Sequence, residues 1–312
     1  MNYKQQILPE LRPIARKIPY NRAVIRGANV FQAVSFHLTA VPREVSHHKI
    51  TLKGYRGMPF VTHVFAPDGL TGPLPCLLYV HGGAFSYKAS AYHKKLACRY
   101  AAGAACRVFF PDYHLSPKYP CPAAYEDVLA LYKFIAEHGE ACGIEPERIG
   151  VAGDSAGAAL AALLANRCAQ EKLPPPCLQM LVYPLTDAAM QTDSMAKFTD
   201  TPLWNAKNNR RMWSYYCKNL RAEDMGDISP MHSPLPQVIP PAYIETAEYD
   251  CLHDEGVLYG QRLREAGAQV VINETQGTIH GYDCALHTAA AQHSVEKRIL
   301  FLKRGFCGDP AV

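Results

Sequence analysis

Hydrophobic and polar positions follow two patterns along the chain. Two early segments, residues 49–54 and 59–66, interleave β-branched or aromatic side chains with polar ones around a turn at Gly57, which is typical of an antiparallel pair. The later apolar runs are continuous, which is typical of parallel strands buried on both faces. They lie at residues 77–80, 108–110, 149–152, 180–183, 242–245 and 270–272.

Segments long enough for helices separate the continuous apolar runs. They lie at residues 91–105, 123–137, 156–170, 255–266 and 288–303. Because a strand followed by a helix recurs, the pattern predicts an α/β fold in which helices cover a mostly parallel sheet. No repeat or low-complexity tract interrupts this alternation.

Two stretches, residues 1–45 and 186–228, do not fit the alternation. In the second, Met212, Tyr216 and Leu220 recur at helical spacing. We expect both stretches to be helical additions above the carboxyl ends of the strands, where ligands bind in such folds; ordinary packing helices elsewhere are the alternative. Four aromatic residues of the second stretch could line a pocket or pack the cap, and packing is expected for most: Trp204, Trp213, Tyr215 and Tyr216.

These patterns divide the chain into a core and a cap, each made of two segments. The prediction is an N-terminal part of the cap at residues 1–45, a first core part at 46–185, a cap insertion at 186–228 and a second core part at 229–312. At 312 residues the chain is long enough to bury one large core under such a cap.

Composition and charge narrow the class of protein. Apolar residues make up 48% and charged residues 19%, which excludes a disordered or coiled-coil chain. The formal charge is only +4, and the one dense basic stretch, residues 207–211, is short, so no nucleic-acid partner is expected. Without an apolar signal segment or a run long enough to span a bilayer, the sequence predicts a protein with no membrane partner.

Cysteine usage indicates the compartment. The 11 cysteines are scattered singly with no Cys-x-x-Cys pair, which argues against a disulfide framework and against a zinc ribbon. A reducing compartment fits this usage best, and the cytoplasm is therefore predicted. No nucleotide-binding glycine motif and no metal-binding motif occurs, so neither a cofactor nor a metal is expected. His47, His48 and His93 would hold a metal only if distant parts of the chain converged.

A glycine-flanked serine follows the apolar run at residues 149–152. The sequence Gly-Asp-Ser-Ala-Gly at 153–157 then opens an Ala/Leu-rich helical segment, which is the strand-turn-helix context of a nucleophile elbow. Ser155 must take a strained backbone there, and glycines two residues away on each side let the strand and the helix approach. The pattern predicts Ser155 as a nucleophile.

A second glycine turn, His-Gly-Gly-Ala-Phe at residues 81–85, follows the predicted strand at 77–80. A pair of glycines at such a turn can aim backbone N–H groups at a single point. If Ser155 attacks a carbonyl, the resulting oxyanion needs such donors, and the amides of Gly82, Gly83 and Ala156 are the candidates. A plain glycine turn is the alternative.

A serine hydroxyl needs an imidazole base that is oriented by a carboxylate. In hydrolases whose serine sits on such a strand-turn-helix elbow, the chain order is serine, acid, histidine. Asp250 and His280 follow the predicted strands at 242–245 and 270–272, on the same sheet edge as Ser155. They are the predicted acid and base. Five other candidates are expected to lie on the solvated surface of helices: Asp254, Glu255, His253, His287 and His293. Cys251 is expected to be a buried structural thiol.

Five motifs in this order resemble those of the hormone-sensitive-lipase-like esterases, which are α/β-hydrolases. They are His81-Gly-Gly-Ala-Phe, Asp112-Tyr-His-Leu-Ser-Pro, Gly153-Asp-Ser-Ala-Gly, Asp250-Cys-Leu-His-Asp-Glu-Gly and Ile279-His-Gly. The resemblance covers roughly residues 45 to 305. It implies an eight-stranded, mostly parallel sheet with a helical cap, and hydrolysis of short-acyl carboxylic esters with the same residues in the roles given above.

The chain departs from the family pattern at two places. After Asp112 and Tyr113 the family usually has Arg-Leu-Ala-Pro-Glu, where this chain has His-Leu-Ser-Pro-Lys at 114–118, and the residue after the elbow is Ala158 in place of the common glycine. Neither change removes a catalytic group. The sequence thus predicts a serine carboxylesterase acting on a small ester through an acyl-enzyme. The alternatives are a catalytically silent binding module and an amidase or peptidase on the same scaffold. The sequence leaves open whether the protein forms a homodimer.

Overall fold

The fold is described from a computed structural model, which describes residues 3–309. Its centre is an eight-stranded sheet in the order β1-β2-β4-β3-β5-β6-β7-β8. β1 pairs antiparallel with β2, and β2 with β4, whereas every other neighbouring pair is parallel. The strands are β1 (Val45–Lys53), β2 (Pro59–Pro67), β3 (Leu74–Val80), β4 (Arg107–Pro111), β5 (Ile144–Asp154), β6 (Gln179–Val182), β7 (Ala242–Tyr249) and β8 (Val270–Ile279).

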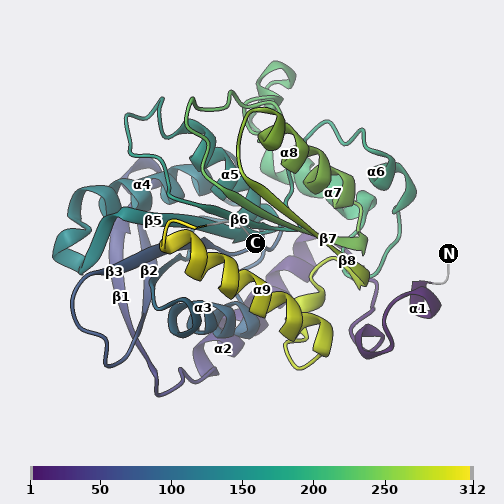
Figure 1. Cartoon of the computed structure of the whole chain (residues 1–312). Helices are drawn as coiled ribbons and strands as arrows, with labels where there is room; N and C mark the ends of the chain where they lie inside the picture. The colour runs from purple at the N-terminus through teal and green to yellow at the C-terminus, as the bar shows by residue number, and fades with distance from the viewer. Residues whose placement is uncertain (1–2, 310–312) are drawn as a thin grey trace.

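Helices cover both faces of this sheet (Figure 1). One face carries α3 (Ala91–Ala104) and α9 (Ala289–Phe306), which contact each other. The other carries α4 (Ala123–His138), α5 (Ala156–Arg167) and α8 (His253–Glu265). The predicted α/β fold with a mostly parallel sheet is confirmed.

Two apolar cores follow from this layering. Leu160 of α5 and Val128 of α4 belong to the core on one side of the sheet, and Tyr100 of α3 and Phe301 of α9 belong to the core on the other. The strands between them alternate their side chains into both cores, as Leu78 and Leu77 of β3 show. This burial on two sides explains why the central strands are continuously apolar in sequence.

The two stretches that broke the alternation form further helices. Residues before the sheet form α1 (Tyr3–Gln6) and α2 (Arg22–Leu38), and the segment between β6 and β7 forms α6 (Asp193–Lys197) and α7 (Ala206–Tyr216). Asn21 and Asn205 cap the first turns of α2 and α7 by accepting backbone N–H groups with their side chains. Tyr20 packs on Trp204 and Tyr215, with ring centroids 5.5 and 5.6 Å apart, so the two stretches contact each other.

Candidate active site

Ser155 occupies a sharp turn between β5 and α5. Its φ of +55° is a left-handed conformation that a residue with a side chain rarely adopts. A Cβ atom on Gly153 would lie 2.4 Å from the backbone of Gly157, and one on Gly157 would lie 2.1 Å from the carbonyl oxygen of Val80. The two glycines are therefore required by close approach of strand and helix, as the sequence predicts.

The structure brings three distant residues together at this turn. His280, directly after β8, places Nε2 2.9 Å from Ser155 Oγ. Asp250, directly after β7, places Oδ2 2.6 Å from His280 Nδ1. The carboxyl ends of parallel strands meet at one edge of the sheet, so residues 155, 250 and 280 lie side by side although they are far apart in sequence.

The surroundings of Asp250 set the orientation of the imidazole. Its carboxylate is fully buried, and Oδ1 accepts a hydrogen bond of 3.0 Å from the backbone N–H of Leu252. Because Oδ2 is an acceptor, Nδ1 of His280 carries a proton, and Nε2 of the neutral ring is free to accept from the Ser155 hydroxyl. The ring of Tyr183 packs 4.6 Å from the His280 ring and fixes its position further.

The glycine turn after β3 faces the same site. Gly83 has φ +108°, and Ala84 and Phe85 have φ +55° and +52°, so three successive residues take left-handed conformations. A Cβ atom on Gly82 would lie 2.3 Å from the carboxylate of Asp154. Within residues 3–309, no loop hydrogen bond uses the backbone N–H of Gly82, Gly83 or Ala156 as donor, so these groups remain unengaged.

Asp154 and His93 form a buried pair that sequence reasoning missed. The Asp154 carboxylate accepts from Tyr79 Oη at 3.0 Å and from His93 Nε2 at 3.3 Å. The backbone N–H of Ser90 donates to His93 Nδ1 at 3.1 Å, so the proton of a neutral His93 ring lies on Nε2. Burial raises the pKa of Asp154, but His93, His81 and Tyr79 together outweigh this, and the pKa lies below its usual value. An acidic residue inside the elbow motif was the signal available.

A cavity of about 240 Å³ opens onto Ser155 and His280. Its walls come from the N-terminal stretch, through Tyr20 and Gln32, and from the insertion, through Trp204. Aromatic rings dominate the walls, and Tyr87 and Tyr92 complete them beside the glycine turn. Of these five wall residues, Trp204 is the one that the sequence offers as a candidate for lining a pocket. The others come from distant segments, and such walls leave no local pattern in the sequence.

Most of the aromatic residues of the insertion pack the protein, as expected. Tyr216 stacks on Phe85 with ring centroids 3.8 Å apart, and Trp213 lies 6.0 Å from the same ring. Tyr215 packs on Tyr20. Trp204 differs, since it lines the cavity and lies 6.2 Å from His280.

The rival acids and bases are placed differently from the expectation that all lie on the solvated surface of helices. Glu255 is fully buried, not solvated: its Oε2 accepts from the backbone N–H groups of Thr186 and Asp187 at 2.8 and 3.0 Å. Burial raises the pKa of Glu255 to about 8. His253 and Asp254 lie on α8 but are partly buried, and they contact each other at 2.8 Å. His293 is exposed on α9 as expected, whereas His287 is exposed in the turn before α9.

Cys251 and the histidines considered as metal ligands add neither a reactive thiol nor a metal centre to the site. Cys251 is fully buried, and burial raises the pKa of its thiol well above the usual value, as expected for a structural cysteine. Across the part of the chain that is described, no group of three or more His, Cys, Asp or Glu is placed to hold a metal. His47 instead pairs with His63, Nε2 to Nδ1, at 2.9 Å.

His114 replaces the arginine that the family resemblance leads one to expect. Its backbone N–H and its Nδ1 both contact Oδ2 of the fully buried Asp127, at 2.7 and 2.6 Å. The other oxygen of Asp127 accepts from the backbone N–H of Tyr55 at 2.8 Å. The histidine therefore supplies a partner for this carboxylate, while Lys118 stays exposed.

Comparison with known proteins shows the family to which this chain belongs. A family model described as alpha/beta hydrolase fold matches residues 77–284. Esterase LipI of Mycobacterium tuberculosis is 32% identical over 89% of this chain and 88% of its own length, and carboxylesterase NlhH of the same species is 30% identical over 96% and 97%. The crystal structure of esterase LipW from Mycobacterium marinum superposes with a TM-score of 0.88 at 26% identity, covering 97% of this chain and 96% of that one.

A bacterial heroin esterase superposes with a TM-score of 0.87 at 28% identity over 97% of this chain and 98% of its own. This chain therefore belongs to the α/β-hydrolase family, and the resemblance to hormone-sensitive-lipase-like esterases is confirmed. With relatives of this kind over nearly its whole length, it is an enzyme of the carboxylesterase class. Among the described helices, none is long and apolar enough to cross a membrane.

Proposed function

We propose that this enzyme hydrolyses short-acyl carboxylic esters through a covalent acyl-enzyme on Ser155. The observation that carries the proposal is the hydrogen-bonded series Ser155 Oγ to His280 Nε2 at 2.9 Å and His280 Nδ1 to Asp250 at 2.6 Å. His280 takes the proton of the hydroxyl as Ser155 Oγ attacks the ester carbonyl, and the protonated ring then delivers that proton to the departing alcohol. Water, activated by the same imidazole, releases the acid.

The oxyanion of each tetrahedral intermediate is held by backbone amides in this proposal. Gly82, Gly83 and Ala156 supply them, and their lack of other hydrogen-bond partners in the described loops supports the role. Ala156 is also the first residue of α5, so the positive end of the helix dipole adds to the stabilisation. Asp250 keeps the imidazole in the required tautomer and stabilises the imidazolium.

The size of the cavity limits the acyl group. The cavity has a volume of about 240 Å³ and is bordered by Tyr20, Tyr87 and Trp204, which favours a short acyl chain. We expect activity to fall steeply beyond about six to eight acyl carbons, because further methylenes find no space against rigid aromatic walls. A panel of nitrophenyl esters of increasing acyl length measures this, and a rate that climbs up to long chains would contradict it.

A fluorophosphonate probe and a nitrophenyl acetate assay test the mechanism together. Wild type is expected to be labelled and to release nitrophenol above the buffer rate, whereas Ser155→Ala is expected to do neither. Ser214→Ala, which removes an exposed hydroxyl on α7, is the matched control and should behave as wild type. Equal labelling of wild type and Ser155→Ala, or a wild type without turnover, would refute the proposal. An anilide of the same acid decides between esterase and amidase.

We also propose a cytoplasmic location for this enzyme, and we treat its oligomeric state as a separate prediction. All 11 cysteines are free thiols, which supports a reducing compartment. Measurement of the thiol count on protein purified under non-reducing conditions tests this. The homodimer that the sequence leaves open stays a prediction, and sedimentation of the purified chain measures it.

A further inference from the structure

The outward side of α2 is unusual for a surface helix. Apart from Arg22, Arg26 and His37, every exposed position of the helix is apolar, and the helix holds no acidic residue. These apolar positions form what we call the outer face of α2: Ala23, Gly27, Val30, Phe31, Val34 and Leu38. A surface helix normally turns charged side chains to water on this side, so the outer face of α2 lacks its usual solvation.

The large side chains of this face are well exposed. Val30, Phe31, Val34 and Leu38 retain 64, 73, 51 and 75% of their accessible surface. At 100° per residue, positions i, i+1, i+4 and i+8 share one side of a helix, so these four side chains form one continuous patch. Figure 1 shows α2 at the periphery of the molecule beside α3, which it contacts.

A groove with a strong positive charge borders the patch. It has a volume of about 1290 Å³, and Val30 and Val34 of the outer face line it together with residues after β4 and along β2. Five cationic side chains line this basic groove: Arg22, Arg26, Lys88, Lys118 and Lys218. Among the described side chains that line it, Asp112 is the one carboxylate, and none of the five cations forms a salt bridge with a described residue.

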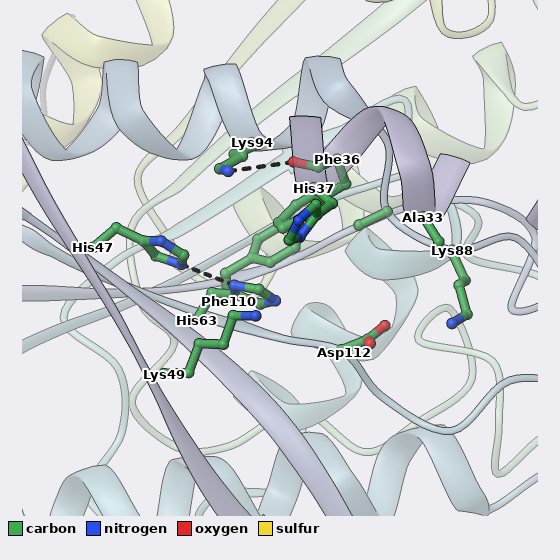
Figure 2. A pocket seen from close by; sticks show the side chains of 11 residues that line it. Ala33, Phe36, His37, His47, Lys49, His63, Lys88, Lys94, Phe110 and Asp112 are labelled. Atoms are coloured by element: carbon green, nitrogen blue, oxygen red, sulfur yellow. Dashed lines mark hydrogen bonds between the residues drawn. The ribbon is translucent and has the colours of Figure 1, made fainter. Parts of the chain in front are cut away.

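The helix that carries the patch is anchored from behind. Phe36 is buried against the rings of His63 and Phe110, at 4.8 and 5.9 Å. Lys94 Nζ donates to the carbonyl oxygen of Phe36 at 3.3 Å (Figure 2) and to that of Thr39 at 2.7 Å. It therefore caps the C-terminal end of α2. The outer face is therefore a fixed surface feature of the folded protein.

The outer face of α2 and the basic groove together indicate what kind of partner binds this surface. A second copy of this chain would cover the apolar patch but bring two sets of unpaired cations near each other, and a dissolved polyanion would neutralise the groove but leave the patch in water. An anionic lipid surface satisfies both, since an apolar face enters the acyl region while flanking Arg and Lys contact the headgroups. We propose that α2 docks this enzyme peripherally on membranes that contain anionic phospholipids.

This docking would place the catalytic cavity beside the lipid. Ala28 and Gln32 of the same helix line that cavity, and so does Ile18, which is 42% exposed. The proposal departs from the sequence prediction of no membrane partner, which rested on the lack of a spanning or signal segment and not on a helix lying in the interface. It does not depend on the proposed function, because vesicle binding is measured without turnover.

Co-sedimentation of the purified full-length chain with vesicles tests the proposal. We expect binding to vesicles of phosphatidylcholine mixed with phosphatidylglycerol, weaker binding to phosphatidylcholine alone, and a loss of binding as salt is raised. The double variant Phe31→Ser with Leu38→Ser is expected to bind at least about tenfold more weakly, since two large apolar side chains no longer enter the bilayer. Arg26→Gln is expected to bind about fivefold more weakly at low salt.

Matched variants keep the outcome interpretable. Val238→Ser and Leu258→Ser remove exposed apolar side chains elsewhere, and both should bind vesicles as wild type does. Every variant should retain its melting temperature and its turnover of a water-soluble ester. Wild type that ignores anionic vesicles at low salt would overturn the proposal, as would binding that the Phe31 and Leu38 changes leave intact. A dimer that these changes dissociate, without any vesicle binding, would assign the face to a second copy instead.

Discussion

At the residue scale, the two histidines whose rings hydrogen-bond to side chains of the elbow hold their protons on opposite nitrogens. Asp250 keeps the proton of His280 on Nδ1, while the Ser90 backbone N–H leaves the proton of His93 on Nε2, where it faces Asp154. One ring can therefore accept a proton from Ser155, and the other is committed to a buried carboxylate. Two identical side chains take different roles because their hydrogen-bond partners differ.

Replacing Asp250 by asparagine should reduce kcat by about 10⁴-fold. The amide group can donate to Nδ1, which favours the tautomer with the proton on Nε2, and that tautomer cannot accept from the Ser155 hydroxyl. Asp254→Asn, four residues further on in the first turn of α8, is the control and should retain activity. Steady-state kinetics on nitrophenyl acetate measures both, and near-normal kcat in Asp250→Asn would remove Asp250 from the mechanism.

The candidate site could be predicted from sequence where short motifs carry it, but not where distant side chains meet. Ser155 and the glycine pair lie in local patterns, and Asp250 and His280 followed from chain order and strand ends. His93 left no comparable signal, since its partner Asp154 is 61 positions away. Glu255 was placed on the surface by its position in a helix, whereas the segment at Thr186 and Asp187 covers it.

At the element scale, the C-terminal helix is joined to the sheet by a buried ionic cluster. Arg298 of α9 is fully buried, and its guanidinium contacts both Glu245 of β7 and Asp283 after β8. Burial raises the pKa of Glu245, but Arg298 together with the hydroxyls of Tyr282 and Tyr243 outweighs this, and the pKa lies below its usual value. Asp283 also accepts from Tyr183 at 2.6 Å, and the Tyr183 ring packs on His280. The cluster therefore supports the segment that carries the proposed base.

We expect Arg298→Met to lower the free energy of unfolding by about 3 to 5 kcal/mol, because it leaves two carboxylates buried without a cation. Urea denaturation measures this quantity. Lys303→Met, an exposed position of the same helix, should change it little. A small loss in Arg298→Met would show that water or rearrangement supplies the missing partner.

Strand positions followed from the sequence better than strand lengths. The apolar runs marked all six parallel-type strands, yet β8 extends to Ile279 and β5 begins at Ile144. β8 lies at the edge of the sheet with most of its residues only partly buried, so its polar positions 273–278 interrupt the apolar pattern. β5 is a central strand, but its residues 145–148 are mostly polar because they lie in a register shift between the pairs Ile144–Leu74 and Ile149–Cys76 and are only partly buried or exposed.

At the scale of the whole molecule, two buried histidines and one half-buried histidine link stability to pH. Burial lowers the pKa of His47 to about 4, of His63 to about 3 and of His81 to about 3. In the unfolded chain these rings titrate near their ordinary value of 6.5. Between about pH 6.5 and pH 3 to 4 the unfolded chain therefore binds more protons, and the stability of the fold decreases as pH falls through this window.

The variant His63→Phe should flatten this acid slope. A phenyl ring can occupy the place between Phe36 and Phe65 without titrating, so the slope below pH 6.5 should fall by up to about 1.4 kcal/mol per pH unit for the one proton removed. Chemical denaturation at a series of pH values gives the slope. His293→Phe is the exposed control, and an unchanged slope in His63→Phe would mean that His63 is not neutral in the fold.

The walls of the catalytic cavity come from opposite ends of the polypeptide, and this has a consequence for biosynthesis. Tyr20 and Gln32 leave the ribosome before any strand has formed, whereas His280 follows all eight strands. A nascent chain therefore carries these wall residues and Ser155 long before the imidazole of the proposed triad has been made. Under the proposed mechanism, ester cleavage begins only once β8 and His280 are in place, and a chain truncated before β8 is expected to be inactive however well its first strands assemble.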